Sequence, residues 1–106
     1  MIKITFNPKK LELKIKGHAG HNKKGEDIVC SAVSSLFYTL AQSLIDSQAM
    51  LKIQPFFRDK DGDGCLRCRP KEEYINNIQL IYWVVLEGLH MVAQNYPKYV
   101  RFEEIS

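Results

Sequence analysis

The chain has 106 residues, of which 45% are hydrophobic and 25% charged, and its formal net charge is +3 at pH 7. This length predicts a single domain, 1–106, and the ordinary composition excludes fibrous and disordered classes of protein. The positive charge is spread along the chain, whereas a nucleic-acid-binding protein usually concentrates Lys and Arg in one stripe. We therefore expect no nucleic-acid partner.

The sequence predicts neither a membrane span nor an export signal. The longest apolar-rich stretches are interrupted by polar residues, among them Asn77, Gln79, Glu87 and His90. No basic segment followed by an apolar one stands at the start, which argues against a signal peptide. The three cysteines are odd in number and too few for a disulfide framework, which fits a reducing compartment. We expect a cytoplasmic protein with no membrane partner.

The first half of the chain predicts a hairpin, a helix and a third strand. Apolar and polar residues alternate over 1–6 and again over 11–16, with a turn signal between them, so we expect two strands, the second ending near Gly17. From Ile28 the apolar residues recur every three or four positions, which predicts a helix of about five turns ending at Ser47. A strand over 50–57 is expected to follow.

The second half predicts a fourth strand, a longer helix and a last strand. The fourth strand is expected over 65–69, a second helix from Pro70 to about Tyr96, and a final strand around Val100 and Phe102. The resulting order ββαββαβ, with short hairpins, predicts an α+β fold. Its two helices should pack on one face of a mainly antiparallel sheet.

Cys30 lies near the predicted start of the first helix. Asp27 directly precedes the first apolar residue and is the expected N-cap, which would place the thiol in the first turn, near the positive end of the helix dipole. Such a position lowers the pKa of a thiol, and the thiolate is the nucleophilic form. Cys30 shares its helix face with Ser34 and Phe37, at the edge of the buried stripe, where it should remain accessible.

His18 follows the second predicted strand and begins a polar loop that contains Gly20 and Gly25. An imidazole titrates near neutral pH, so it can act as the general base for a thiol. The glycines would allow the loop to act as a lid that swings His18 over the helix start. An inert core cysteine and an ordinary loop histidine explain the same residues equally well on chemistry alone.

A longer pattern around these two residues resembles a known family. It comprises Gly17-His18-Ala19, Gly25, Asp27-Ile28-Val29-Cys30 and Ser31-Ala32-Val33-Ser34. This pattern is similar to the signature of the ribosomal-processing cysteine protease family Prp, also called YsxB-like, and the resemblance extends over most of the chain. The sequence departs from the usual pattern at Gly20-His21 and at Ser31, which puts the exact substrate in doubt.

The resemblance implies that Cys30 is the nucleophile and His18 the general base. It also implies that Asp27 supports the site and that Ser34 lines it, one turn below the thiol. Acyl transfer needs donors for the oxyanion, and the backbone N–H groups of Cys30 and Ser31 are the expected ones. No cofactor is implied.

The resemblance also implies a substrate and an assembly state. Family members remove a short N-terminal extension from large-subunit ribosomal protein twenty-seven, cutting after a pair of phenylalanines. Phage relatives act on capsid or scaffold proteins with a similar recognition sequence. Members are homodimers with a mobile loop between the His and the Cys. We therefore expect a homodimer that acts on a protein substrate with a flexible N-terminal extension.

Two other motifs suggest metal binding. The segment 59–64 reproduces the first half of a calcium loop, but Pro70 stands where a bidentate Glu is required, so a hairpin turn is expected. Cys65 and Cys68 could form a zinc site with His18 and His21 in a zinc-stabilised binding module. In a strand, however, positions i and i+3 point to opposite faces, so we expect no metal.

Two further alternatives stay open. The fold could be protease-like but inactive, and serve only to bind. The aromatic residues could line a site for a phenylalanine side chain or fill the core, and the core is the expected place for Tyr74, Tyr82, Trp83, Phe56 and Phe57.

Overall fold

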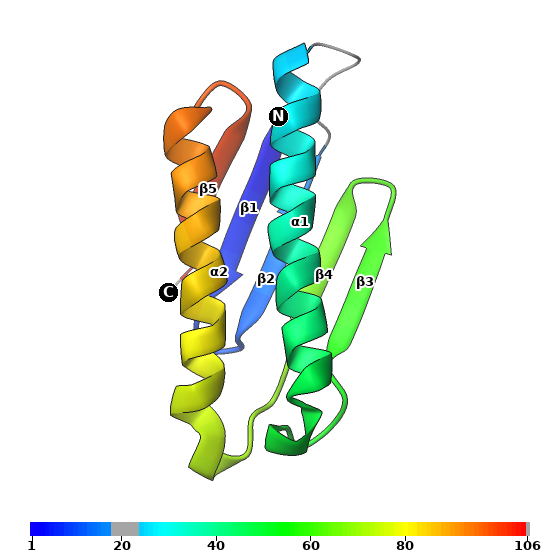
Figure 1. Ribbon diagram of the computed structural model, residues 1–106, viewed down its shortest axis with the longest axis vertical. Helices are drawn as coiled ribbons and strands as arrows, with labels where there is room; N and C mark the ends of the chain where they lie inside the picture. The colour runs from blue at the N-terminus through cyan, green and yellow to red at the C-terminus, as the bar shows by residue number, and fades with distance from the viewer. Residues whose placement is uncertain (18–23, 106) are drawn as a thin grey trace.

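The computed structural model describes the backbone of residues 1–17 and 24–105, and the side chains of 1–17 and 28–105. Its strands and helices follow the predicted order ββαββαβ (Figure 1). The elements are β1 (Ile2–Asn7), β2 (Glu12–Lys16), α1 (Lys24–Asp46), β3 (Phe56–Lys60), β4 (Asp63–Arg67), α2 (Ile75–Asn95) and β5 (Val100–Glu104). Short 3-10 helices at Gln48–Met50 and Glu72–Tyr74 follow α1 and precede α2.

The five strands form one mixed sheet in the order β3-β4-β2-β1-β5. Three neighbouring pairs are antiparallel, as predicted, and β1 pairs with β5 in parallel. The parallel pair arises because the chain reaches β5 through α2, and a parallel strand requires such a crossover connection. The edge strands are β3 and β5.

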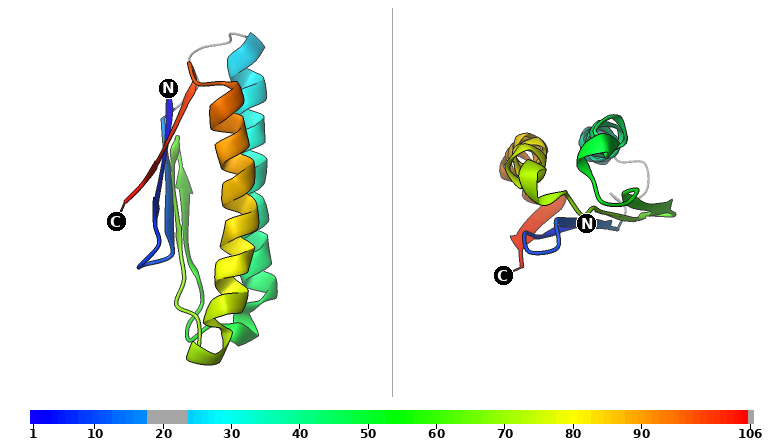
Figure 2. Two further views of the ribbon diagram at one scale, coloured as in Figure 1. Left: turned by 90° about the vertical axis from the view of Figure 1, so that its left-hand side faces the viewer. Right: turned by 90° about the horizontal axis from the view of Figure 1, so that it is seen from below.

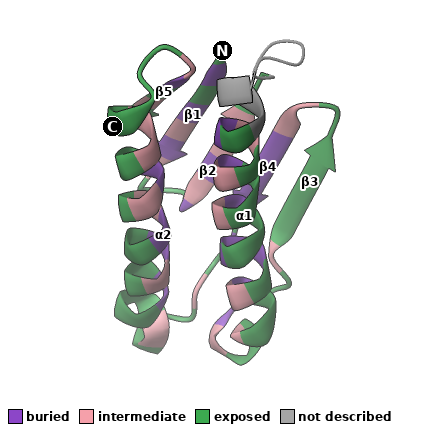
Figure 3. Ribbon diagram, turned by 45° about the horizontal axis from the view of Figure 1, so that its top comes forward, coloured by how far each residue is buried: buried purple, intermediate pink, exposed green. Residues whose placement is uncertain are grey.

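Both helices cover the same face of the sheet, as predicted (Figure 2). The alternation in β1 explains this arrangement, since Ile2, Ile4 and Phe6 are buried while Lys3 between them is exposed. The buried positions of the strands and helices meet in one core between the two layers (Figure 3). The opposite face of the sheet carries no helix among the described residues.

The predicted bounds of the third and fourth strands were wrong. Residues 48–50 form a 3-10 helix, and Leu51 makes only an isolated bridge with Pro70. The hairpin between β3 and β4 is also tighter than the six-residue turn expected over 59–64. Its turn is Asp61 and Gly62, with φ of 47° and 77°. Two central residues with positive φ form the kind of turn that matches the twist of paired strands, so the ladder continues up to that turn.

The first helix begins earlier than predicted. Since α1 starts at Lys24, Asp27 lies inside the helix and is not the N-cap, and Gly25 also belongs to the helix instead of the loop. The prediction placed the boundary at the first apolar residue, Ile28. Polar residues can extend a helix beyond its buried stripe, because the helical hydrogen bonds do not depend on apolar side chains.

Gly17 fixes the point at which the chain leaves β2. Its φ of 100° is a conformation that favours glycine, and a Cβ atom there would collide with the backbone carbonyl of Met1. Its N–H donates a hydrogen bond to the carbonyl of Gly62, at 2.9 Å. Directly before His18, the chain therefore packs closely against the backbone of Met1 and is hydrogen-bonded to the β3–β4 turn.

By length and composition alone, residues Ile28–Asp46 of α1 could cross a membrane, although 33% of that segment is buried inside the fold. Core helices of folded domains meet the same criterion, and α1 packs on the sheet through Val33, Leu40 and Leu44. The absence of a membrane partner stays a prediction.

Candidate active site

Cys30 lies on α1 at the edge of the core, as predicted. Its side chain is partly exposed and packs against the core cluster, while its neighbour Val29 is fully buried. Because α1 starts at Lys24, Cys30 is the seventh residue of the helix and lies in the second turn instead of the first. The effect of a helix dipole decays within the first turn. Cys30 therefore lies beyond the part of the helix on which the dipole acts most strongly.

The earlier helix start also corrects the predicted oxyanion donors. Only the first four N–H groups of an α-helix lack a partner inside the helix. The N–H groups of Cys30 and Ser31 lie beyond that range and belong to the helical ladder. The side chains of Ser31 and Ser34 are exposed on the same stretch of helix, so among the described residues their hydroxyl groups are candidate hydrogen-bond donors beside the thiol.

Several predicted site residues lie outside the described residues. His18, Gly20 and His21 belong to the segment 18–23, and the side chain of Asp27 is likewise not described. The flanking elements, β2 and α1, meet the segment at the same end of the molecule (Figure 1). The end of β2 and the start of α1, the end of the helix that carries Cys30, therefore lie at the same end of the molecule (Figure 1). The pairing of Cys30 with His18 stays a prediction.

A long groove runs along α1 on the side of the edge strand β3. It has a volume of about 1090 Å³. Its lining residues come from α1, from the connection that follows it and from the β3–β4 hairpin: Ser31, Ser34, Ser35, Tyr38, Thr39, Ala41, Gln42, Ile45, Gln48, Gln54, Pro55, Phe57 and Leu66. Cys30 is not itself a lining residue, but it directly precedes Ser31 and lies one turn before Ser34, so it adjoins the end of the groove that these two serines form.

Two aromatic residues, Tyr38 and Phe57, line this groove, and the buried ring of Phe37 supports them from the core. The rings of Phe37 and Phe57 stack with centroids 5.6 Å apart, and Tyr38 lies 6.1 Å from Phe57. Gly64 makes this packing possible, because a Cβ atom there would lie 3.1 Å from Cζ of Phe37. The groove therefore offers an apolar, aromatic surface between two secondary-structure elements.

Hydroxyl and amide groups surround the aromatic rings. Thr39 donates a hydrogen bond to the carbonyl of Ser35 at 2.6 Å, and the Gln42 amide donates to Asp46 at 2.9 Å. A surface with aromatic rings and neutral polar groups suits an extended peptide, whose side chains are varied and whose backbone needs hydrogen bonds. A signal for this groove was present in the sequence, since residues 28–45 contain no Asp, Glu, Lys or Arg.

The expectation that the aromatic residues fill the core was correct only for Tyr82, which is buried. Trp83, Phe56 and Phe57 are exposed, and Tyr74 is partly exposed. The difference arises because β3 is an edge strand and because Trp83 follows Tyr82 on α2, turned away from the sheet. Phe57 contributes to the groove instead.

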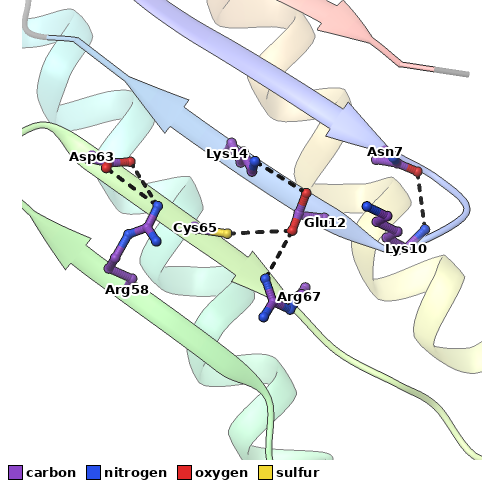
Figure 4. A network of polar contacts seen from close by, with 8 residues as sticks. All are labelled: Asn7, Lys10, Glu12, Lys14, Arg58, Asp63, Cys65 and Arg67. Carbon is purple, nitrogen blue, oxygen red and sulfur yellow. Dashed lines mark hydrogen bonds and ion pairs between the residues drawn. The ribbon is translucent and has the colours of Figure 1, made fainter.

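The other two cysteines lie on opposite faces of the sheet, as predicted. Sγ of Cys65 lies 3.9 Å from Oε2 of Glu12 on the open face (Figure 4). Sγ of Cys68 accepts a hydrogen bond from the hydroxyl of Tyr82 at 3.5 Å on the helix side. The two sulfurs therefore do not converge on one ion. Within the part of the chain that the structure describes, no group of three or more His, Cys, Asp or Glu side chains could hold a metal ion.

The surroundings of Cys65 and Cys68 keep both thiols in the neutral form. Burial raises the pKa of the Cys65 thiol, and the nearby Glu12 carboxylate raises that pKa further. Burial likewise raises the pKa of the Cys68 thiol. Since the thiolate is the reactive form, neither is suited to nucleophilic attack near neutral pH. Cys30 differs from both in being partly exposed.

These environments predict the order in which the cysteines are alkylated. With iodoacetamide near neutral pH, Cys30 should be labelled first, because Cys65 and Cys68 are only 1% and 5% exposed and their raised pKa values leave little thiolate. Peptide mapping by mass spectrometry over a time course measures the order. The Cys30→Ser variant is the control and should take up almost no label in the same time. Equal labelling of Cys65 would contradict the assignment.

Comparison with known proteins identifies the family of the chain. Residues 1–101 match the family model of the cysteine protease Prp. The ribosomal processing cysteine protease Prp of Staphylococcus aureus (strain Mu50) is 26% identical over 102 residues, covering 94% of this chain and 93% of that protein.

Solved structures show the same fold. The ribosomal processing protease Prp from S. aureus, in complex with a covalently linked product peptide, aligns with a TM-score of 0.77 at 22% identity, covering 99% of this chain and 100% of that chain. SMU.848 from Streptococcus mutans aligns with a TM-score of 0.71 at 25% identity, covering 98% of this chain and 91% of that chain. The match of the family model over nearly the whole chain settles the family: the chain belongs to the cysteine protease family Prp, and it is a cysteine protease.

Proposed function

We propose that the protein is a processing endopeptidase that removes a short N-terminal extension from a precursor, with Cys30 as the nucleophile and His18 as the general base. One observation carries this proposal. Of the three cysteines, all of them within the described residues, only Cys30 is partly exposed, and its helix neighbours Ser31 and Ser34 line one end of a groove suited to a peptide. A peptide that extends along the groove would bring one of its bonds to the thiol.

The proposed substrate is large-subunit ribosomal protein twenty-seven, or a phage capsid or scaffold protein, cut after a pair of phenylalanines. The S. aureus relatives of known structure hold a substrate peptide or a covalently linked product peptide. In this chain the rings of Tyr38 and Phe57 form an aromatic surface in the groove, packed on the buried ring of Phe37. Aromatic side chains of a substrate would gain favourable ring contacts there as well as burial.

The proposed mechanism is acyl transfer through a covalent intermediate. The Cys30 thiolate attacks the scissile carbonyl carbon, and the His18 imidazolium then protonates the leaving amine. Water, deprotonated by His18, hydrolyses the resulting thioester and regenerates the thiol. The segment 18–23 would act as the lid that carries the base to the bound peptide.

The oxyanion of this mechanism needs a hydrogen-bond donor near the thiol. The backbone N–H groups of Cys30 and Ser31 are used within α1. We assign this role to the hydroxyl of Ser34, which lines the groove one turn from Cys30. Removal of one such donor commonly lowers kcat by about 100-fold or more.

Replacing the nucleophile should abolish cleavage. Cys30→Ala and Cys30→Ser should each lower the rate on a peptide containing Phe-Phe by at least about 1000-fold, since the remaining groups cannot form the thioester. Mass spectrometry of the products measures the rate, and thermal melting checks that the fold persists. Cys65→Ser is the matched control and should cleave normally. Normal cleavage by either Cys30 variant would show that another residue is the nucleophile.

Two adjacent phenylalanines test the role of the groove. Phe57 lies in the groove, whereas the ring of Phe56 lies on the opposite face of β3, 4.1 Å from the Arg67 guanidinium. Their exposed fractions are similar, 43% and 38%. Phe57→Ala should raise KM about tenfold, because it removes one aromatic contact with the peptide. Phe56→Ala should leave KM unchanged. Equal effects of the two substitutions would count against peptide binding in this groove.

The alternative of a zinc-stabilised module has little support, because Cys65 and Cys68 face opposite sides of the sheet. An inactive, peptide-binding fold remains the second candidate. The assay with Cys30 variants separates it from the enzyme, since an inactive fold would bind the Phe-Phe peptide and leave it intact even with Cys30 present.

We propose further that the protein is a cytoplasmic homodimer that pairs through α2. The inner face of α2 packs in the core, and its outer face carries a stripe of apolar side chains that are each at least 60% exposed: Leu80, Trp83, Val84 and Met91. Glu87 interrupts this stripe, but such a concentration of exposed apolar side chains on a surface helix marks an interaction site. A two-fold dimer would cover this stripe with its own copy. The free cysteines support a reducing compartment.

A charge placed in the stripe should prevent dimerisation. Trp83→Glu is expected to weaken the dimer at least about 30-fold, because a buried aromatic anchor would be lost and a charge buried in its place. Sedimentation equilibrium measures the dissociation constant. Ile53→Glu is the matched control, since Ile53 is 61% exposed and Trp83 63%, and it lies outside α2. A monomeric wild-type protein, or an equal effect of both variants, would contradict the proposed surface.

A further inference from the structure

The open face of the sheet gathers seven of the fifteen Lys and Arg residues of the chain. Strand residues that point away from the helices include seven cations and three carboxylates: Lys3, Lys14, Lys16, Arg58, Lys60, Arg67 and Arg101, with Glu12, Asp63 and Glu103. Figure 4 shows several of them on the sheet with the helices behind. Residues 28–46 and 75–95 of the helices, by contrast, contain no Lys or Arg.

Five of these side chains form one straight row across all five strands. The pairing register places Arg101 beside Lys3, Lys3 beside Lys16, Lys16 beside Asp63, and Asp63 beside Lys60. Neighbouring strands are about 4.8 Å apart, so the row is about 19 Å long. We call these five residues the basic row. It carries four positive charges and one negative charge.

The basic row is electrostatically unfavourable for the sheet itself. Arg101, Lys3 and Lys16 are consecutive side chains of the same sign, and like charges on paired positions destabilise a sheet. Nζ of Lys3 forms an ion pair with Oε2 of Glu103 at 3.9 Å, and both side chains are about half exposed. Among the described residues, Lys16 and Arg101 have no ion-pair partner.

Asp63, the one carboxylate of the basic row, already has an ion-pair partner. Asp63 pairs with Arg58 of the next row at 3.3 Å. Lys60, on the other side of Asp63, has no ion pair within the part of the chain described. The four cations of the row are therefore only weakly compensated by the protein. A bound polyanion would neutralise them and offset the repulsion among Arg101, Lys3 and Lys16.

We propose that the basic row binds the phosphate backbone of a single-stranded nucleic acid. A row of four cations, interrupted only by Asp63, can follow the linear charge of a phosphate chain, which carries one charge per about 3.4 Å of each strand in a duplex. Within the described part of the chain, this face of the sheet has no projecting helix or ribbon to enter a duplex groove (Figure 2), which favours a single strand. The row lies on the face opposite the helices, so the peptide groove beside α1 stays free.

This proposal departs from the expectation that the chain has no nucleic-acid partner. That expectation depended on the even spread of Lys and Arg along the sequence. In strands, alternate residues share a face, and pairing brings distant strands together. Lys3, Lys16, Lys60 and Arg101 are far apart in sequence but lie in one row of the sheet.

Fluorescence anisotropy with a fluorescein-labelled oligouridylate of about 20 nucleotides tests the proposal, with KCl varied from about 20 to about 200 mM. Four phosphate contacts predict a slope of log Kobs against log [KCl] of about −3 for a single strand. The triple variant Lys16→Gln, Lys60→Gln, Arg101→Gln should reduce that slope to about −0.7 and weaken binding on the order of 100-fold at about 50 mM KCl.

A second triple variant controls for net charge. Lys9→Gln, Lys52→Gln, Lys71→Gln removes the same number of exposed cations outside the row and should change the slope and the affinity little. Equal losses in the two triple variants would overturn the proposal, because net charge alone would then explain binding. Absence of binding by the wild type at the lowest KCl concentration would overturn it as well.

Further binding measurements identify the partner, and thermal melting checks the fold. Oligothymidylate binding would support the proposal equally, and the tighter of the two oligonucleotides indicates RNA or DNA. Displacement of the oligouridylate by poly-glutamate of equal charge, at equal concentration, would overturn the proposal in favour of an acidic protein. The row variant should melt at or above the wild-type temperature, since it relieves like-charge repulsion. A loss of binding would then not be a loss of fold.

Discussion

Burial of only one face of the sheet is the constraint on which the rest of the structure depends. Ile4 and Leu13 point into a core closed by both helices, and the alternate strand positions are left on an open face. Burying apolar surface provides the main stabilisation of such a fold, and it also determines which side of each strand meets α1. The groove and the basic row therefore lie on opposite sides of one sheet, so the two partners proposed for them would not compete for one surface.

Helix α1 performs three tasks with different parts of its surface. One face fills the core through Val33 and Leu40, and another face lines the groove through Tyr38 and Gln42. Cys30 lies at the boundary between these two faces, which explains how a thiol can be supported by packing and still be reached by a peptide. The edge strand β3 completes the groove, because no further strand covers it among the described residues.

The three cysteines show how strongly the surroundings decide the chemistry of one residue type. Cys68 is buried against Tyr82 on the helix side, and Cys65 is covered on the open face beside Glu12. Desolvation raises the pKa of both thiols and keeps them protonated near neutral pH. Cys30 lacks such cover, and this difference in exposure directs the proposed chemistry to α1.

The sequence by itself determined the order of the elements, the face of the sheet that the helices cover, and the place of Cys30 at the edge of the buried stripe. These features follow from the local periods of apolar residues in strands and helices. The sequence did not determine the start of α1 at Lys24 or that of β3 at Phe56, since helical and sheet hydrogen bonds can extend or shorten an element independently of the apolar pattern. The groove and the basic row were decided only by the tertiary structure. Both are assembled from residues far apart in the chain, such as Tyr38 with Phe57 and Lys16 with Arg101, and sheet pairing and helix packing alone bring such residues together.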